Sequence, residues 1–173
     1  MTWRDTGRRW IPPSPNLRSA SAALVYPGVA LLEGTNVSEG RGTEAPFLLL
    51  GAPWLDPSRA RVDLPGFRFS PTRFTPRSTP AAPEPKYRGL ECRGFRIEVT
   101  DPALADPWRL GVELLAPLAQ QPGFAWLREG QAMTTLLGTP ALIGGHLRPE
   151  LFEPAAGAWR EARRREVLAQ TLP

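Results

Sequence analysis

Residues 95–99 read FRIEV, a run in which apolar and charged side chains alternate. Residues 67–69 read FRF and repeat the same alternation. Successive side chains of a strand point to opposite faces of a sheet, so each run predicts a strand with one buried face. Residues 29–32 (VALL) predict a further short buried strand, and the apolar run at residues 47–50 (FLLL) ends at a glycine.

Helix signals surround these strands. Ser19 can cap a short helix, which we expect the Pro-Gly pair at 27–28 to end. Asp106 followed by Pro107 predicts a second helix, because the aspartate accepts from free N–H groups and proline fits the first helical position. A shorter helix is predicted at residues 131–137. A last helix is expected to bury Phe152, Ala156, Trp159 and Ala162.

The chain has 173 residues, of which 21 are proline and 16 are glycine. Both residue types weaken regular elements, so we expect short elements joined by many ordered loops. The strands and helices follow no regular βαβ order. The sequence therefore predicts one α+β domain over residues 1–173, with a small mixed sheet, packed helices and many Pro/Gly-rich loops.

The charge pattern argues against nucleic acid as a partner. Lys and Arg number 21 against 17 Asp and Glu, a formal net charge of +4, and Lys86 is the only lysine. The basic residues are scattered among acids, whereas a nucleic-acid site gathers them in a patch or stripe. We therefore expect no nucleic-acid partner.

Single copies of cysteine and histidine limit the chemistry further. Cys92 has no second cysteine to pair with and is expected to be a small buried side chain. One histidine, His146, excludes a multi-His metal site, so we expect no metal and no cofactor. No apolar run approaches the roughly 20 residues that span a membrane, and the first ten residues lack a signal-peptide core. As written, the sequence is expected to be cytoplasmic and without a membrane partner.

Residues 33–43 read EGTNVSEGRGT and show no hydrophobic period. Glu33 and Glu39 could form a carboxylate pair of the kind that glycoside hydrolysis uses. Asn36 could hydrogen-bond sugar hydroxyls or an acetamido group, and Arg41 could bind a ligand carboxylate at two points. The residues alone leave another interpretation open, in which the acids and the arginine satisfy one another in a structural loop.

Several motifs near the N-terminus resemble a known family. They are residues 12–17 (PPSPNL), 23–28 (ALVYPG), 32–43 (LEGTNVSEGRGT), 46–47 (PF) and 51–54 (GAPW). This set resembles the C-terminal auxiliary domain of the exo-β-N-acetylmuramidases, which are bacterial peptidoglycan-recycling glycoside hydrolases.

The resemblance implies a role for this chain. Members of that family release N-acetylmuramic acid from the non-reducing ends of peptidoglycan fragments. They pair an N-terminal catalytic domain with the auxiliary domain, and the active site lies in the cleft between them. The catalytic glutamates belong to the N-terminal part, so no catalytic residue is carried over to this chain, and we expect it to be inactive alone. The implied partners are an N-terminal catalytic domain or chain and a saccharide that contains N-acetylmuramic acid.

By the same resemblance, the loop at 33–43 would face the cleft and complete the sugar site. Asn36, Glu39 and Arg41 are the predicted cleft-lining residues, with Arg41 placed to bind the lactyl carboxylate of a muramic residue. Glu33, Asn16 and Trp54 are predicted to support them. Trp54 would either stack on a pyranose ring or pack in the core.

Two alternatives stay open. The chain could be a stand-alone, non-catalytic carbohydrate-binding module for muramic-acid ends. It could also be a structural or interaction domain that remains from a longer enzyme.

Overall fold

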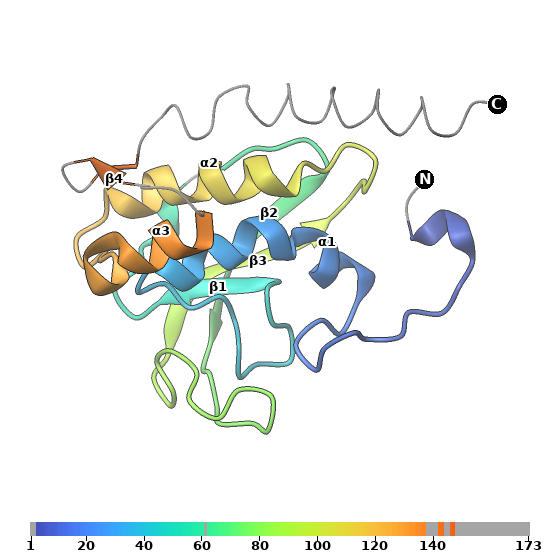
Figure 1. The fold of residues 1–173 in the computed structure, drawn as a ribbon, viewed down its shortest axis with the longest axis horizontal. Helices are drawn as coiled ribbons and strands as arrows, with labels where there is room; N and C mark the ends of the chain where they lie inside the picture. The colour runs from blue at the N-terminus through green and yellow to red at the C-terminus, as the bar shows by residue number, and fades with distance from the viewer. Residues whose placement is uncertain (1–2, 61, 138–141, 144–145, 148–173) are drawn as a thin grey trace.

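The computed structural model describes residues 3–60, 62–137, 142–143 and 146–147. The two longer α-helices lie over one face of a small sheet, and the shortest lies to one side, next to the end of the first helix (Figure 1). A proline-rich loop (residues 75–91) extends away from the helices. The helix predicted to bury Phe152, Ala156, Trp159 and Ala162 lies outside the described residues.

The sheet has the strand order β1-β3-β2, and both pairings are antiparallel. Its strands are β1 (Leu49–Ala52), β2 (Phe67–Phe74) and β3 (Cys92–Val99). The predicted α+β class is confirmed, and so are the strands at the two alternating runs. In β3, Phe95 and Ile97 are buried while Arg96 between them is exposed. The sheet is antiparallel where a mixed one was expected. A separate pair joins β4 (Leu142–Ile143) to β5 (His146–Leu147).

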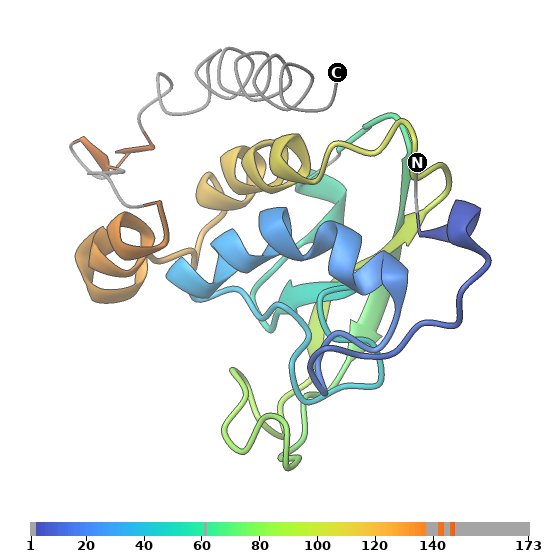
Figure 2. The same ribbon diagram turned by 45° about the vertical axis from the view of Figure 1, so that its right-hand side comes forward.

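Helix α1 (Ala20–Val29) begins as predicted, because the hydroxyl of Ser19 accepts a hydrogen bond from the N–H of Ala22. The prediction that Pro27-Gly28 ends this helix is wrong, since α1 continues through both residues. Gly28 serves helix packing instead: a Cβ at this position would overlap the carbonyl oxygen of Pro107. The missing side chain lets α1 and α2 lie side by side (Figure 2).

The predicted strand at residues 29–32 is also wrong. These residues form the end of α1 and a 3₁₀ helix, Ala30–Gly34. Val29, Leu31 and Leu32 are buried as the apolar pattern required. A run of four apolar residues indicates burial but does not distinguish a strand from a helical turn.

Helix α2 (Pro107–Ala119) has the predicted cap, with Asp106 accepting from the N–H groups of Trp108 and Arg109 at 3.1 and 3.0 Å. It contains Gly111 and Pro117, which are poor helix formers. Packing holds it in place, because each fully buried leucine contributes about 2 kcal/mol. Its fully buried leucines are Leu110, Leu114, Leu115 and Leu118.

Helix α3 (Gln131–Leu137) matches its prediction and follows a 3₁₀ helix, Leu127–Gly130. Two further 3₁₀ helices cover Arg4–Thr6 and Pro57–Arg59. Among the described residues, no helix combines the length and apolar character needed to cross a membrane. Cys92 is fully buried, as expected.

Candidate functional site

Residues 32–43, the site loop, run between α1 and β1 and are held by three other segments. The N–H of Asn36 donates to the carbonyl of Ala125 at 2.9 Å. Ser38 forms a two-way backbone bridge with Gly51, and the N–H of Arg77 in the proline-rich loop donates to the carbonyl of Gly42. Backbone contacts from three directions therefore fix the site loop, which has no regular structure after Gly34.

Arg41 lies between the two glutamates of this loop. Its Nη2 is 2.7 Å from Glu33 Oε1, and its Nε is 3.3 Å from Glu39 Oε1. The guanidinium also lies over the ring of Phe47, 5.0 Å from the centroid. Burial alone would lower the pKa of Arg41, but the hydrogen bond to Glu33 and the charges of Glu33 and Glu39 raise it above its usual value. Arg41 is therefore a permanent cation between two carboxylates.

Lys86 completes this network from the proline-rich loop. Its ammonium donates to Glu39 Oε2 at 3.0 Å and to the carbonyls of Leu32 and Val37, each at 2.9 Å. The Glu39 side chain is only 5% exposed, so both of its oxygens are paired out of solvent. Sequence reasoning missed Lys86 as a site residue. The one available signal was that it is the single lysine of an arginine-rich chain.

Asn36 lies in the same loop but makes different contacts. Its amide donates to the carbonyl of Gly123 at 2.7 Å, and its side-chain oxygen accepts from the N–H of Ala125 at 2.9 Å. Its backbone carbonyl accepts from the hydroxyl of Tyr87 at 2.6 Å. Asn36 therefore joins the site loop to residues 123–125, and these bonds use one donor and one acceptor of its amide.

Trp54 connects to Asn36 through Tyr87, a second residue that sequence reasoning missed. The indole N–H of Trp54 donates to the Tyr87 hydroxyl at 3.0 Å, and its ring packs edge-to-face with Phe124 at 6.4 Å. Trp54 is partly buried against the main core. Burial raises the pKa of Tyr87 above its usual value, although the Trp54 hydrogen bond opposes this shift.

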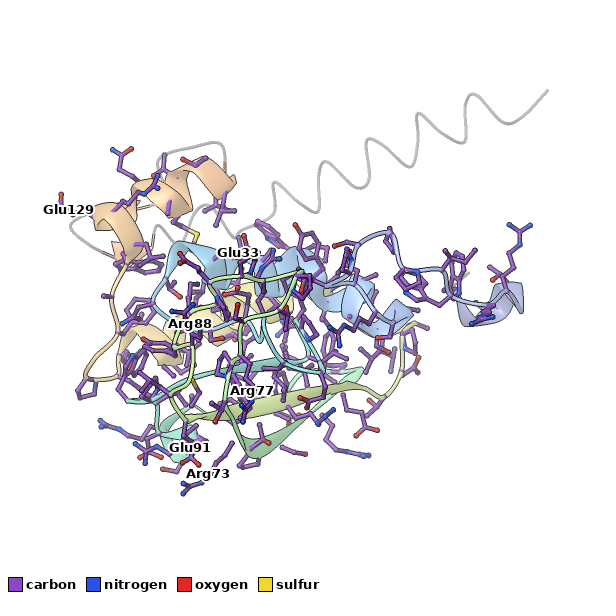
Figure 3. The ribbon with its side chains drawn as sticks, turned by 90° about the horizontal axis from the view of Figure 1, so that it is seen from below. Glu33, Arg73, Arg77, Arg88, Glu91 and Glu129 are labelled. Carbon is purple, nitrogen blue, oxygen red and sulfur yellow. The ribbon has the colours of Figure 1, made fainter. Side chains whose placement is uncertain are left out.

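Asn16 is buried, and its amide donates to the carbonyl of Ala81 at 3.0 Å. It thus ties the N-terminal lead-in, residues 3–17, to the proline-rich loop. The six predicted site residues fall into three groups: Glu33, Glu39 and Arg41 in one ion network, Asn36 and Trp54 around Tyr87, and Asn16 by itself. Figure 3 views the molecule from the side of the proline-rich loop, with Glu33, Arg77 and Arg88 labelled.

The ion network, formed by Glu33, Glu39, Arg41 and Lys86, has two negative and two positive groups. A glycosidase needs its two carboxyl groups on either side of the scissile bond. Here a guanidinium occupies the position between the carboxylates. The arrangement suits recognition or rigidity better than acid–base chemistry. Within the described residues, no three His, Cys, Asp or Glu side chains gather in a group suited to a metal ion.

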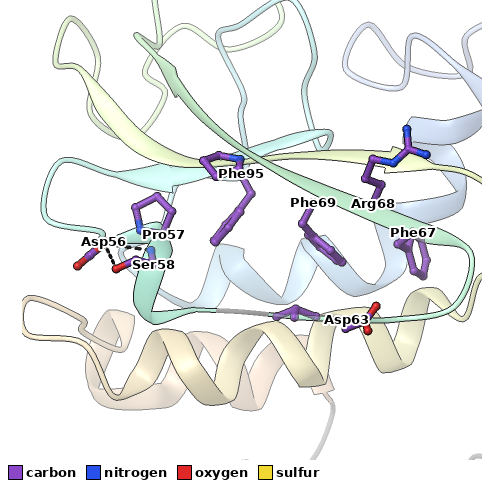
Figure 4. Close-up of a pocket in the computed structure, with 10 residues that line it drawn as sticks. Asp56, Pro57, Ser58, Asp63, Phe67, Arg68, Phe69 and Phe95 are labelled. Atoms are coloured by element: carbon purple, nitrogen blue, oxygen red, sulfur yellow. Dashed lines mark hydrogen bonds between the residues drawn. The ribbon is translucent and has the colours of Figure 1, made fainter.

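A cavity of about 820 Å³ lies elsewhere, between the sheet and residues 56–58 and 62–63 (Figure 4). Its apolar wall includes Phe67, Phe69 and Phe95, and Asp56 and Asp63 lie at its rim. The pKa of Asp56 is lowered because its carboxylate accepts two hydrogen bonds from Ser58. None of the predicted site residues lines this cavity.

Comparison with known proteins agrees with the resemblance found in the sequence. Residues 24–165 match the family described as "Exo-beta-N-acetylmuramidase NamZ, C-terminal". A relative from Bacillus subtilis (strain 168), the peptidoglycan beta-N-acetylmuramidase NamZ, is 40% identical over 106 residues, which cover 58% of this chain and 24% of the relative. The match thus spans about a quarter of that relative's length.

A solved structure shares the fold. The crystal structure of a DUF1343 family protein from Bacteroides fragilis NCTC 9343 superposes with a TM-score of 0.57 at 22% identity, covering 91% of this chain and 38% of that protein. The family match covers most of the chain, and its range includes the site loop. The chain therefore belongs to the family of C-terminal domains of the exo-β-N-acetylmuramidase NamZ.

Proposed function

We propose that this chain is the substrate-cleft domain of a peptidoglycan-degrading exo-β-N-acetylmuramidase and works with an N-terminal catalytic domain or chain. The observation that carries this proposal is the ion network on the site loop, in a chain of the NamZ C-terminal family. The proposed ligand is a saccharide that contains N-acetylmuramic acid.

The length of the relatives supports a division of labour. The match covers 24% of the B. subtilis muramidase and 38% of the B. fragilis protein. Most of each relative therefore lies outside the region that this chain matches. We assign the catalytic carboxylates to that other region, because Arg41 separates Glu33 from Glu39 here.

The most exposed part of the network is the pair formed by Arg41 and Glu33. Their side chains are 31% and 32% exposed, whereas Glu39 is buried. A sugar hydroxyl can donate to a carboxylate and accept from a guanidinium at once, so this pair suits neutral hydroxyl groups. A lactyl carboxylate would have to compete with Glu33 for Arg41, and that contact stays a prediction.

Calorimetric titration of the full chain with N-acetylmuramic acid tests the proposal, with N-acetylglucosamine as the control sugar. An assay on a chromogenic muramide runs beside it, with and without an N-terminal domain from a relative. We expect no turnover by the chain alone, and turnover that depends on the N-terminal domain and is stimulated by this chain. Turnover by the chain alone would overturn the assignment and make Glu33 and Glu39 the first candidates for catalysis.

One observation favours the stand-alone binding module as a second candidate. Every partner of Glu39 and Lys86 in the network comes from this chain, so the network forms without another domain. A module of this kind would bind N-acetylmuramic acid equally well with and without the N-terminal domain. A chain with neither binding nor stimulation would be the structural remnant.

A further inference from the structure

We propose that Lys86 is the positioning residue of the Glu33–Arg41 surface: its ammonium is a tethered counter-ion that fixes Glu39 and, through Glu39, the guanidinium of Arg41. What this surface binds rests on the proposed function. The positioning itself is a property of this chain and is tested separately below.

Three oxygens accept hydrogen bonds from the ammonium of Lys86, and together they form the ammonium seat. Two are the carbonyls of Leu32 and Val37 at 2.9 Å, and the third is Glu39 Oε2 at 3.0 Å. An ammonium has three N–H donors and no acceptor, so this seat saturates it. The two carbonyls belong to residues on either side of Gly34, where the 3₁₀ helix ends. The ammonium therefore ties the start of the site loop to its middle.

A lysine fits this seat better than an arginine. Three acceptors that converge on one point match a compact ammonium, whereas a guanidinium is a planar fork with spread donors. The chain uses arginine at every other basic position, and Lys86 is its single lysine among 21 basic residues. The single lysine of the chain therefore lies where three acceptors converge on one point.

The backbone around Lys86 is held so that its side chain points at the site loop. Tyr87 has φ 56°, a left-handed conformation that non-glycine residues seldom adopt, and Gly89 follows with φ 78°. The Tyr87 hydroxyl donates to the carbonyl of Asn36, and the N–H of Gly89 donates to the carbonyl of Pro76. An uncommon φ at a bulky residue persists where surrounding contacts impose it.

The effect reaches Arg41 through the two oxygens of Glu39. Lys86 holds Oε2, and Arg41 Nε lies 3.3 Å from Oε1, a longer contact than its 2.7 Å bond to Glu33. Without the ammonium, the buried carboxylate of Glu39 would have Arg41 as its one cationic neighbour among the residues that the structure describes. A buried carboxylate strongly favours a paired cation. Arg41 would therefore move towards Glu39 and loosen its bond to Glu33, which changes the exposed surface.

The experiment removes the ammonium by mutation and restores it with an amine in solution. Lys86→Ala keeps Cβ, and n-propylammonium supplies the atoms that are lost. We expect the variant to melt about 5–10 °C below the wild type, because the buried Glu39 carboxylate has lost one of its two cationic partners. Saturating n-propylammonium should recover at least about half of that loss, since a ligand that binds the folded state raises its stability. The NMR signal of the Arg41 Nε–H should shift in the variant and return with the amine.

Matched controls separate the ammonium from packing and ionic strength. Lys86→Met fills the same space with an apolar chain and should not respond to the amine. Tetramethylammonium carries the charge without N–H donors and should not rescue Lys86→Ala. Arg68→Ala removes an exposed ion pair between Arg68 on β2 and Glu98 on β3, and it should leave the Arg41 signal unchanged.

The outcomes for positioning and for the proposed function are distinct. Recovery of the Arg41 signal by n-propylammonium supports the positioning role, whether or not N-acetylmuramic acid binds. An Arg41 signal that is unchanged in Lys86→Ala overturns it, and so does a shifted signal that n-propylammonium fails to restore. Where the wild type binds the sugar, its affinity should fall in Lys86→Ala and return with the amine. A wild type that neither binds nor stimulates turnover rejects the proposed function alone.

Discussion

The ammonium of Lys86 lies 3.0 Å from the carboxylate of Glu39, although 47 residues separate them in the sequence. This contact joins the proline-rich loop to the site loop and makes the network of four charges electrically balanced. Glu39 is buried and Arg41 is partly exposed. The contacts that balance the charge of Glu39 therefore lie below the surface, while Arg41 itself reaches the surface. A ligand would meet an arginine and a glutamate already held in a fixed relation.

Arg41→Ala should weaken binding of N-acetylmuramic acid, because it removes a charged donor and leaves Glu39 with one cationic partner. Loss of a charged hydrogen bond corresponds to an affinity reduced about 10- to 100-fold. Calorimetry on the full chain measures this change. Arg41→Lys keeps the charge but not the two-pronged geometry, and we expect it to recover less than the wild-type affinity.

Two outcomes would contradict the prediction for Arg41→Ala. Unchanged affinity, or unchanged kcat/KM in an assay reconstituted with an N-terminal domain, would remove Arg41 from the ligand contacts. The network would then be a structural feature, and the site would have to be sought elsewhere on the chain.

Gly28→Ala should destabilise the fold, because the added Cβ overlaps the carbonyl of Pro107 and crowds Gly111 on α2. We expect a loss of about 1–3 kcal/mol, the usual range for overpacking. Pro27→Ala is the matched control at the preceding position, where the side chain is exposed. Proline at this position lacks the N–H that a residue inside α1 would donate. Its effect should be within about 1 kcal/mol and stabilising. Urea unfolding of both variants checks the contrast, and equal effects would contradict it.

Pro27 and Gly28 also show which parts of the fold could be predicted from the sequence and which could not. Alternation at 67–69 and 95–99 and the cap at Asp106 are local signals, and the strands and the helix appeared where they predict them. Pro27-Gly28 has the local form of a helix end, but Gly28 is required by α2, which lies about 80 residues further along. Local patterns report burial and capping, whereas helix–helix contact depends on the assembled fold.

The candidate site could likewise be predicted from the sequence only in part. Glu33, Glu39 and Arg41 are close in sequence, and the structure brings them together as a network. Lys86 and Tyr87 contact this loop from another segment, and no spacing rule connects them to it. Asn36 matched a sugar-binding pattern by type, yet its amide bonds to the backbone of residues 123–125. Residue type indicates what a side chain can bind, and the fold decides which partner it has.

Cys92 should make the stability of the protein fall at alkaline pH. Burial, with a smaller contribution from the charge of Glu91, raises the pKa of the Cys92 thiol to about 11 from an ordinary value of 9.0. The unfolded chain therefore loses this proton first as the pH rises, and it binds fewer protons than the folded chain above about pH 9. The stability is complete below the unfolded pKa and falls as the pH approaches 11. At pH 10.5 the loss should be about 2 kcal/mol.

Urea unfolding at pH 8, 9.5 and 10.5 measures this dependence. Cys92→Ala removes the thiol and should flatten the slope, although the variant is less stable at pH 8 because it loses buried volume. The raised pKa of Tyr87 acts in the same direction at still higher pH, so the comparison of the two proteins isolates the thiol. An identical slope in both would show that Cys92 does not titrate in this range.

Trp54→Phe separates the two roles predicted for this tryptophan. The indole packs against Phe124 and donates to Tyr87, so we expect the substitution to reduce stability by about 1–3 kcal/mol. We expect the affinity for N-acetylmuramic acid to change by less than about twofold, because a ring already packed against the core offers little face to a sugar. Trp3→Phe in the exposed lead-in is the control for loss of an indole. Normal stability with a lost affinity would reverse the assignment, since a stacking platform contributes to the bound state and a packing residue contributes to the folded state.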